Sequence, residues 1–597
     1  MTENLKIKEQ IKGRPMIYWA GKKPLGIIEN YPAQLIDKIG NNKIEEEVKK
    51  PNYKNLQDNW HNLLFHGDNK EILSTLLTNG FRGKIDLIYI DPPFDSKADY
   101  VKKVELRGEK RKLTADEQSF FEQVQYTDLW KNDEYLQFMY ERLILLRELL
   151  SEKGSIYLHC DWHKSHHLRF LLDEVFGERN FINEVVWAYS TQGRPDNKFA
   201  RKHDSIFIYA KNQKNYIFNV KGIKTEYSKE YIKSHFTDRD EKGNICRIRK
   251  DAGKERIYYP DEGMIPNDFW NDIFYENPMA NTRTDYPTQK PEDLLKRIIK
   301  ASSNENSIIL DCFAGSGTTL AVAEKLNRRW IGADCNKGAI QTTIKRISKI
   351  KKQQEENKDN KQENYQNNDI LHFRVNNYDF QERFTLREII FEKYGIEKLN
   401  DRFFDGTLGE KLIKIVEFNK PLTLLEIEEI KDEIKRNKSD DVRDIIIICS
   451  GQETILANEI AKYNKKSPIN KIEIRDIQKD GLLIFDPAIC HCDIKKENNK
   501  IRISIKEYLS PTILKRLEID KNLFSEQITD FKSQIDMVLF DFDYNGKVFN
   551  ICESDIPAKK KDLIKGDYEF DIDKNNQGKI AVKIIDMIGE EVLIIED

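Results

Sequence analysis

Residues 85–94, Ile85-Asp86-Leu87-Ile88-Tyr89-Ile90-Asp91-Pro92-Pro93-Phe94, join an apolar run to an abrupt polar end. The run 85–90 has the length and composition of a buried strand of the kind found in parallel α/β sheets. Pro92 and Pro93 cannot continue a sheet ladder, so the strand is predicted to end at Asp91. Ligands of open α/β sheets bind beyond the carboxyl ends of the strands. Residues 91–94 are therefore predicted to line a pocket with oxygen acceptors and one aromatic wall, which suits a flat ring carrying an amino group.

Apolar runs and amphipathic segments alternate on both sides of this stretch, between residues 61 and 345. This alternation predicts an α/β fold with a doubly wound, mostly parallel, Rossmann-like sheet. Residues 182–188 and 204–210 have no helical segment between them, so they are predicted to form an antiparallel edge hairpin. The predicted strands are 63–66, 85–90, 154–159, 182–188, 204–210, 307–312 and 329–333, and the predicted helices include 132–151, 164–176, 291–302 and 317–327.

The rest of the chain is interpreted as three further parts. Residues 1–60 lack clear periodicity and are interpreted as an N-terminal arm. Residues 346–369 begin as a basic helix and become a polar tract, which is typical of a linker. Strand-like runs in residues 370–597 predict a C-terminal α+β domain that binds a partner, forms a dimer or contacts DNA.

Composition excludes several classes of protein. A chain of 597 residues is too long for one core, and its 33% charged residues indicate a highly solvated surface. No apolar run approaches the roughly 20 residues that span a bilayer, so we expect no membrane contact and a cytoplasmic location. The eight cysteines include no C-x-x-C pair, and we expect no metal site. With a net charge of −3, contact with a polyanion must come from local basic patches, such as that in residues 101–112.

A Gly-rich turn follows the predicted strand 307–312, in Asp311-Cys312-Phe313-Ala314-Gly315-Ser316-Gly317-Thr318. Its glycines permit a tight turn and close approach of a ligand at a helix N-terminus. No lysine follows Gly317, so the turn is not a P-loop and nucleoside triphosphate binding is not indicated. The next predicted strand leads to Asp334, which is placed to accept hydrogen bonds from ribose hydroxyls. Taken alone, Asp334 is equally compatible with a helix cap.

These two stretches together resemble the S-adenosylmethionine-dependent DNA amino-methyltransferases, which join a D/N/S-P-P-Y/F/W catalytic motif to an F-x-G-x-G cofactor motif. The resemblance covers roughly residues 60–345. The catalytic motif comes first, which is called the β arrangement, and residues 211–284 match the target-recognition segment by position. The resemblance implies that Asp91, Pro92, Pro93 and Phe94 are catalytic and that Asp311, Phe313, Gly315, Gly317, Thr318 and Asp334 bind the cofactor.

Two shorter matches extend the resemblance. Tyr286-Pro287-Thr288-Gln289-Lys290-Pro291 is similar to family motif X, which implies that Thr288, Gln289 and Lys290 lie near the methionine end of the cofactor. Asp68 follows an earlier predicted strand, where the family places an acid near the cofactor adenine. An ordinary Pro-started helix N-terminus and a helix N-cap are the alternatives for these two stretches.

The chemistry also follows from the residues. An exocyclic amine is a poor nucleophile because its lone pair is delocalised into the ring. The Asp91 carboxylate and the Pro92 carbonyl are expected to accept its two N–H bonds, while Phe94 stacks on a base that has left the duplex. No cysteine follows a proline, which disfavours cytosine-C5 methylation. In the family that the chain resembles, Asp-Pro-Pro with an aromatic residue in the β arrangement goes mostly with adenine, so the resemblance implies adenine N6 as the target. Cytosine N4, an RNA or protein substrate, and a DNA-binding role without catalysis stay open as alternatives.

The expected partners also come from the resemblance. Motif order and residues 154–161 are similar to type III modification subunits, although the recognition segment is shorter and the C-terminal half larger. This implies double-stranded DNA as substrate and a restriction–modification or defence setting. The chain carries no ATPase or convincing nuclease motif, so cleavage would need a helicase or nuclease partner, and a homodimer stays open. The basic residues of the 101–112 insertion, including Lys102 and Arg107, are expected to contact phosphates, and a solvated charged loop is the alternative.

Overall fold

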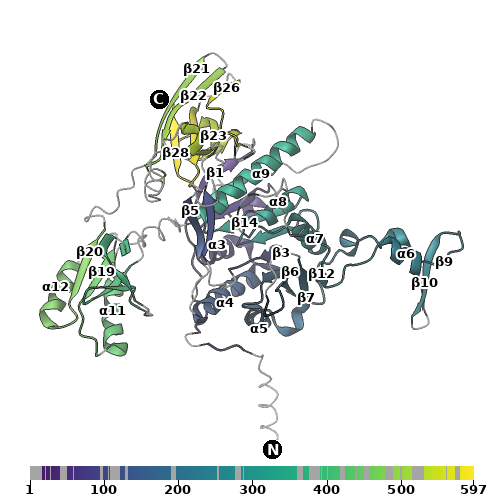
Figure 1. Cartoon of the computed structure of the whole chain (residues 1–597), viewed down its shortest axis with the longest axis horizontal. Coiled ribbons are helices and arrows are strands. Elements are labelled where there is room, and N and C mark those ends of the chain that lie inside the picture. Colours follow the sequence, from purple (N-terminus) through teal and green to yellow (C-terminus); the bar gives the residue numbers. More distant parts are fainter. Residues whose placement is uncertain are drawn as a thin grey trace, which may run out of the picture. The chain divides into compact units, whose positions relative to one another are not determined.

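The structure is a computed structural model of the chain (Figure 1), and it contains two compact units. The first unit combines residues 1–376, 492–505 and 535–597, and the second combines residues 377–491 and 506–534. The structure describes residues 16–19, 22–26, 28–40, 50–57, 59–93, 99–104, 107, 121–127, 132–189, 196–251, 254–275, 284, 286, 288–358, 368–375, 390–391, 393–399, 401, 403–416, 422, 424–438, 440–449, 456–477, 488–497, 500–511, 513, 530–557, 559, 561–571 and 578–596.

The first unit is built on one sheet, whose described strands are hydrogen-bonded in the order β12-β7-β8-β6-β3-β13-β14-β2-β15-β1-β24. The central strands from β6 to β15 all run parallel, which confirms the predicted doubly wound α/β fold. β8 is antiparallel to both β6 and β7, which confirms the predicted hairpin. The strand bounds are β1 Ala33–Ile39, β2 Asn62–His66, β3 Ile85–Ile90, β6 Leu150–Cys160, β7 Phe181–Ala188, β8 His203–Ala210, β12 Phe269–Trp270, β13 Ile308–Asp311, β14 Arg329–Asp334, β15 Ile370–Val375 and β24 Phe549–Ile551.

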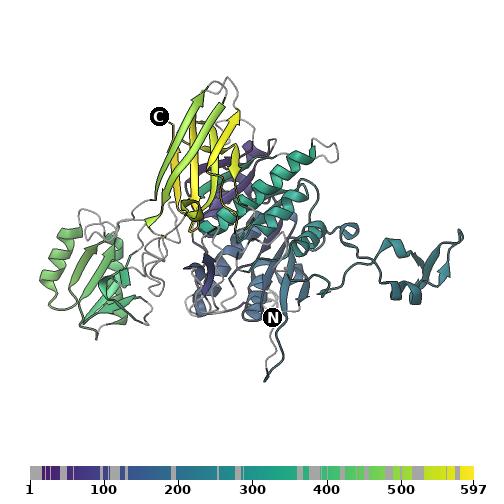
Figure 2. The same ribbon diagram turned by 45° about the horizontal axis from the view of Figure 1, so that its top comes forward.

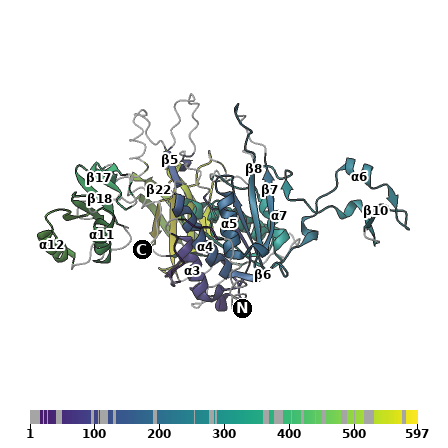
Figure 3. The same cartoon turned by 90° about the horizontal axis from the view of Figure 1, so that it is seen from below.

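Helices cover both faces of this sheet. Apolar residues of α3, α4 and α5 pack on one face, where these helices lie together in Figure 3. Apolar residues of α7, α8 and α9 pack on the other face. The sheet is buried on both sides, which explains why its central strands are continuous apolar runs. The helix bounds are α3 Asn69–Leu76, α4 Asn132–Leu149, α5 Ser165–Phe176, α7 Glu292–Ser302, α8 Thr318–Lys325 and α9 Lys337–Lys358.

Strand β1 lies within the residues that the sequence assigned to an N-terminal arm, and it joins the sheet between β15 and β24. Its charged residues give it the local sequence pattern of a surface segment. Asp37 is buried with the Lys583 ammonium and with Nδ1 of His372, which is 2.8 Å away. Buried charges are tolerated when they are paired. Because these partners lie far away in the sequence, the local pattern gave no sign of a strand.

The boundary predicted at residue 370 also differs from the structure. β15 begins there but belongs to the central sheet, and β24 extends the same sheet from near the C-terminus. Residues 535–597 are part of the first unit, where their strands lie beside the teal helices (Figure 2). Only residues 377–491 and 506–534 form a separate unit. The further strands of the first unit are β4 Asp99–Val104, β5 Phe121–Thr127, β21 Ile489–Glu497, β22 Lys500–Leu509, β23 Ile535–Tyr544, β25 Glu553–Asp555, β26 Asp567–Asp571, β27 Lys579–Asp586 and β28 Glu591–Ile595, with β21 and β22 continuing into the second.

The segment predicted to recognise the target forms a small sheet of its own, with strand order β11-β10-β9. β9 Asp238–Arg239 and β11 Lys254–Tyr258 pair antiparallel with β10 Ile245–Asp251, and helix α6 Lys229–His235 precedes them (Figure 1). Arg249 and Arg256 lie directly opposite each other in this ribbon, and both are exposed. Like charges opposite each other destabilise a sheet, so this ribbon suits contact with an anion.

The second unit is a small α/β domain. Its sheet has the order β16-β17-β18-β19-β20, in which β18, β19 and β20 run parallel. Helices α11 and α12 pack apolar residues on one face of this sheet. The bounds are β16 Glu397–Lys398, β17 Gly406–Leu408, β18 Lys411–Ile415, α11 Leu424–Asn437, β19 Ile445–Cys449, α12 Leu456–Lys466 and β20 Ile472–Asp476. Across the described parts of both units, we find no helix long and apolar enough to cross a membrane.

Candidate active site

Four carboxylates predicted from separate motifs line one edge of the central sheet. Asp91 directly follows β3, Asp311 and Asp334 end β13 and β14, and Asp68 lies just beyond β2. These four strands are consecutive neighbours, and they run parallel. Neighbouring strands lie about 4.8 Å apart, so the row spans roughly 15 Å. The edge can therefore hold an extended ligand along Asp68, Asp334 and Asp311, with Asp91 at one end.

Asp91 has one engaged and one free carboxylate oxygen. Its Oδ2 accepts a hydrogen bond from Nζ of Lys290 at 2.5 Å. Its Oδ1 is buried and has no hydrogen-bond partner among the described residues. Pro92 is buried beside it. The predicted stacking residue Phe94 lies outside the described residues. A buried acceptor without a partner is costly, so Oδ1 is suited to accept a hydrogen bond from a donor on a ligand.

A buried polar network beside Asp91 was not foreseen from the sequence. The Tyr89 hydroxyl lies 2.9 Å from Nδ1 of His159, and Nε2 of that ring lies 3.1 Å from Oδ2 of Asp204. Because a carboxylate only accepts, Nε2 carries the hydrogen and Nδ1 accepts from Tyr89. Tyr189 donates to the other Asp204 oxygen at 3.0 Å. A histidine inside the apolar strand β6 was the only local signal of this network.

The Gly-rich turn has the backbone geometry that the motif requires. Gly315 and Gly317 have φ angles of 52° and 70°, in the left-handed region that glycine adopts without strain. A Cβ at Gly317 would lie 2.5 Å from Oγ1 of Thr343, so a larger residue does not fit there. Thr318 follows as the first residue of α8, and its hydroxyl accepts from Arg346 at 2.9 Å. The turn is therefore supported by α9 and keeps its opposite side for a ligand.

Asp311 and Asp334 hold this turn from the two strands below it. Asp311 accepts from the Phe313 amide at 3.0 Å and from the Thr319 hydroxyl at 2.6 Å. Burial, with a smaller contribution from the charges of Asp91 and Asp334, outweighs these hydrogen bonds and raises the pKa of Asp311 to about 7. Asp334 accepts from the amides of Gly315 and Asn336, both at 2.8 Å, and burial raises its pKa to about 6. Each oxygen of Asp334 has a second lone pair that can accept another hydrogen bond. Acceptance of a ribose hydroxyl by Asp334 stays a prediction.

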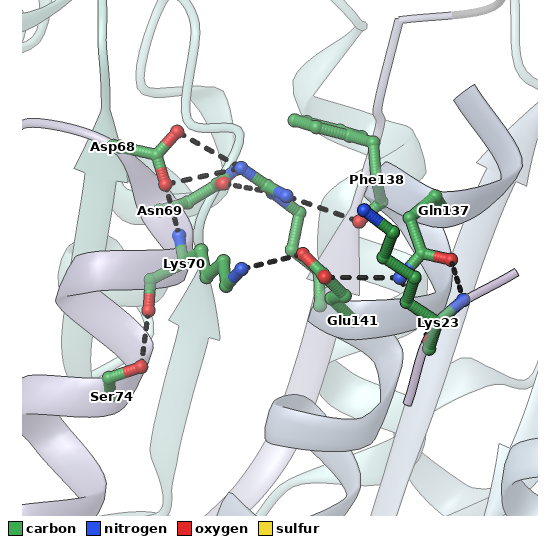
Figure 4. Close-up of polar contacts among 9 residues, drawn as sticks. Lys23, Asp68, Asn69, Lys70, Ser74, Gln137, Phe138 and Glu141 are labelled. Carbon is green, nitrogen blue, oxygen red and sulfur yellow. Dashed lines mark hydrogen bonds and ion pairs between the residues drawn. The ribbon is translucent and has the colours of Figure 1, made fainter. Parts of the chain in front are cut away.

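Asp68 combines a structural role with a position at the same edge (Figure 4). It is the N-cap of α3 and accepts from the Lys70 amide at 2.8 Å, which was the alternative interpretation. Arg142 on α4 also holds both of its oxygens, at 3.1 and 3.0 Å, and donates to Asn69. Asn69 in turn donates to the Cys312 carbonyl at 3.1 Å. The Arg142 bridge, which sequence reasoning missed, ties Asp68 to the strand that carries the Gly-rich turn.

The three residues of the predicted motif X differ in their surroundings. Gln289 is buried and accepts from the amide and the hydroxyl of Thr284, at 2.8 and 2.7 Å. Thr288 has a φ of 63°, which is rare for a β-branched residue. Lys290 reaches Asp91. Binding of the cofactor by these three residues stays a prediction.

The expected phosphate contacts of the 101–112 insertion are only partly described. Arg107 is buried, and it donates to Oδ1 of Asp536 at 2.7 Å and to the Lys559 carbonyl at 3.0 Å. It is therefore engaged within the protein in this structure instead of being free for phosphate. The side chain of Lys102, and residues 108–112, lie outside what the structure describes.

The chain is similar in sequence to known DNA methylases. Residues 85–346 match a family described as DNA methylase. The type II methyltransferase M.EcaI of Enterobacter cloacae is 28% identical over 333 residues, which cover 48% of this chain and 69% of that protein. The DNA adenine methyltransferase YhdJ of Escherichia coli is 27% identical and is covered to 76%, with 44% of this chain.

Some relatives share a smaller part of their own length with this chain. The Mod subunit of the type III restriction–modification enzyme EcoP15I of Escherichia coli is 28% identical over 238 residues, 36% of this chain and 34% of that subunit. The chain thus spans about a third of that relative. Among solved structures, the complex of M1.HpyAVI with SAM is 19% identical, with a TM-score of 0.29, 48% of this chain covered and 98% of that one.

Proposed function

Residues 85–346 belong to the family of N6/N4 DNA methylases, and from this premise we propose that the protein transfers a methyl group from S-adenosylmethionine to adenine N6 in double-stranded DNA. The observation that carries the proposal is the free Oδ1 of Asp91. It is a buried acceptor at the carboxyl end of β3, next to the strand that bears the Gly-rich turn. A buried acceptor at this place is what an exocyclic amine requires.

Asp91 Oδ1 and the Pro92 carbonyl accept the two N–H bonds of the target amine. This pulls the nitrogen toward tetrahedral geometry and directs its lone pair at the methyl donor. The nitrogen gains a bond to the methyl carbon and gives up one proton, which Oδ1 can take. Positioning and electrostatics carry the step without a covalent link to the protein. The base must leave the duplex to reach this pocket.

The remaining edge fits the cofactor. When bound, S-adenosylmethionine supplies a methyl group on a sulfonium, which departs as a neutral thioether. The Gly-rich turn lies at the N-terminus of α8, and the carboxylates of Asp311 and Asp334 lie beneath it. Negative charge suits a ligand with a sulfonium and an ammonium group, while hydroxyls of its ribose need acceptors such as Asp334. Asp68 lies at the far end of the row, where the adenine is expected.

Adenine is preferred over cytosine for two reasons. The Asp-Pro-Pro-Phe motif in the β arrangement goes mostly with adenine, and one similar protein is named a DNA adenine methyltransferase. Cytosine N4 is the second candidate, because both amines need the same acceptors. Type III Mod subunits among the relatives support a restriction–modification role with a separate restriction subunit, and a homodimer is a further proposal.

Expression in a methylation-free bacterial host tests the function directly. We expect modification-sensitive sequencing of the host DNA to find N6-methyladenine in one short motif with the native protein and none with Asp91→Ala. Modified cytosine would overturn the base assignment. An unmodified genome despite folded protein with bound cofactor would contradict DNA as the substrate of the chain acting alone.

A further inference from the structure

Lys290 makes a contact that motif X does not specify. The motif implies a place near the methionine end of the cofactor, and in the structure the Lys290 ammonium lies 2.5 Å from Oδ2 of Asp91. Both side chains are largely withdrawn from solvent, with 9% and 17% of their area exposed. An ion pair so poorly exposed is held in one geometry and is screened little by salt.

Lys290 faces a second carboxylate as well. Burial opposes its charge, but the carboxylates of Asp91 and Asp204 outweigh burial and raise the pKa of Lys290. The lysine therefore stays cationic at neutral pH and cannot serve as a base. Asp204 already accepts hydrogen bonds from His159 and Tyr189, so it is fixed in place. Lys290 thus contacts Asp91 and is also stabilised by the charge of the fixed Asp204 carboxylate.

The backbone before Lys290 is also fixed. Gln289 is tied to Thr284 by two hydrogen bonds, and Pro291 is the N-cap residue of α7. The left-handed φ of Thr288 is strained for a β-branched residue and persists only where the surroundings impose it. Such strain is typical of a side chain whose position matters for function.

We propose that Lys290 is a positioning residue of the methyl transfer: it holds Oδ2 of Asp91 so that Oδ1 is left to accept the amine N–H. This inference rests on the proposed function. Without the ammonium, the carboxylate can rotate, and both of its oxygens compete for the amine. The lysine also compensates the charge of Asp91 when no amine is bound. In this role Lys290 acts through Asp91, whose Oδ2 it contacts.

The test compares steady-state kinetics of the native chain, Lys290→Met and Lys290→Arg on methylation-free genomic DNA, with cofactor affinity measured separately by calorimetry. We expect Lys290→Met to lower kcat at saturating cofactor by about 100-fold, to leave the cofactor Kd unchanged, and to be partly rescued by Lys290→Arg. The acid limb of the kcat–pH profile should move to higher pH in Lys290→Met. Among the described residues, the other titratable groups that act on Asp91 or Lys290 include Tyr89 on β3, Asp311 on β13, Asp204 on β8 and Tyr275, which follows β12.

Two results would overturn the inference. A weakened cofactor Kd with an unchanged kcat would assign Lys290 to the cofactor, and unchanged values of both would deny it any role. If Lys290→Met does not fold, Asp204→Asn reports on the same link, and it should lower kcat without changing the cofactor Kd. A native chain that methylates no DNA would refute the proposed function. If only this inference is wrong, the native chain still methylates DNA, and Lys290→Met shows one of the two contrary results given above.

Discussion

Asp91 and Asp334 are carboxylates at the same edge of the same sheet, yet their surroundings differ. Both oxygens of Asp334 accept backbone amides, from Gly315 and Asn336, so this carboxylate shapes the turn above it. In Asp91 one oxygen is held by Lys290, and the other is buried without a hydrogen-bond partner among the described residues. An unmet buried acceptor costs about 1–3 kcal/mol. The Asp334 carboxylate holds the Gly-rich turn, whereas Asp91 has one oxygen that is open to a hydrogen-bond donor on a ligand.

The largest effect that separates these two regions is expected from Asp91→Ala. Methyl transfer should fall by about 10³-fold or more, because the amine loses its carboxylate acceptor. Cofactor affinity should not change. Asp334→Asn is the matched control with the opposite pattern, a weaker cofactor Kd. Equal loss of cofactor binding in both variants, measured by calorimetry, would remove the distinction between the two carboxylates.

Next in size is the effect of Gly315→Leu, which should abolish detectable cofactor binding. Gly315 has a left-handed φ, and its Cβ would lie 3.4 Å from the ring of buried Tyr286, so a leucine must disturb the turn. Gly83 has a similar φ of 67° with open space around its Cβ. Gly83→Leu should therefore cost about 1–2 kcal/mol of stability and leave cofactor binding intact. Unchanged cofactor affinity in Gly315→Leu would refute the assigned pocket.

The pH dependence of cofactor binding is a smaller effect. Burial raises the pKa of Asp311 to about 7, so the unliganded protein loses stability as the pH rises from about 4 to 7 and this buried carboxyl must ionise. A cationic cofactor favours the ionised form. Its affinity should therefore increase as the pH rises through 7, with proton release on binding. Calorimetry in buffers of different ionisation enthalpy measures this release, and Asp311→Asn should remove it. The same proton release in Asp311→Asn would assign it to another group.

The smallest effect is expected from Thr319→Val, which removes the hydroxyl that donates to Asp311 at 2.6 Å. A hydrogen bond to the ionised form lowers the pKa of a carboxyl, so its loss should move the midpoint of the cofactor–pH profile upward by about one unit. Thr318→Val is the matched control, because the Thr318 hydroxyl contacts Arg346 and not Asp311. A shift of the same size in both variants would count against Asp311 as the titrating group.

The sequence predicted the catalytic half of the molecule well for a physical reason. The strands before Asp91 and Asp311 are buried on both faces, so their apolar runs and abrupt polar ends are local signals that survive folding. Strand β1 was missed because Asp37 is compensated by Lys583 and His372, which are close only in the folded chain. The Lys290 contact with Asp91 was missed for the same reason. A motif gives the residue type and the loop, whereas the direction of a long side chain depends on tertiary structure.

The most direct test of the central claim is methyl transfer by the purified chain from labelled S-adenosylmethionine to unmethylated genomic DNA, followed by digestion and mass spectrometry of the nucleosides. We expect all of the label in N6-methyladenine with the native chain, and none with an Asp91→Ala variant that binds the cofactor normally. Label in N4-methylcytosine would contradict the assignment of adenine. Label that persists in the Asp91→Ala variant would contradict the role of the free Asp91 oxygen.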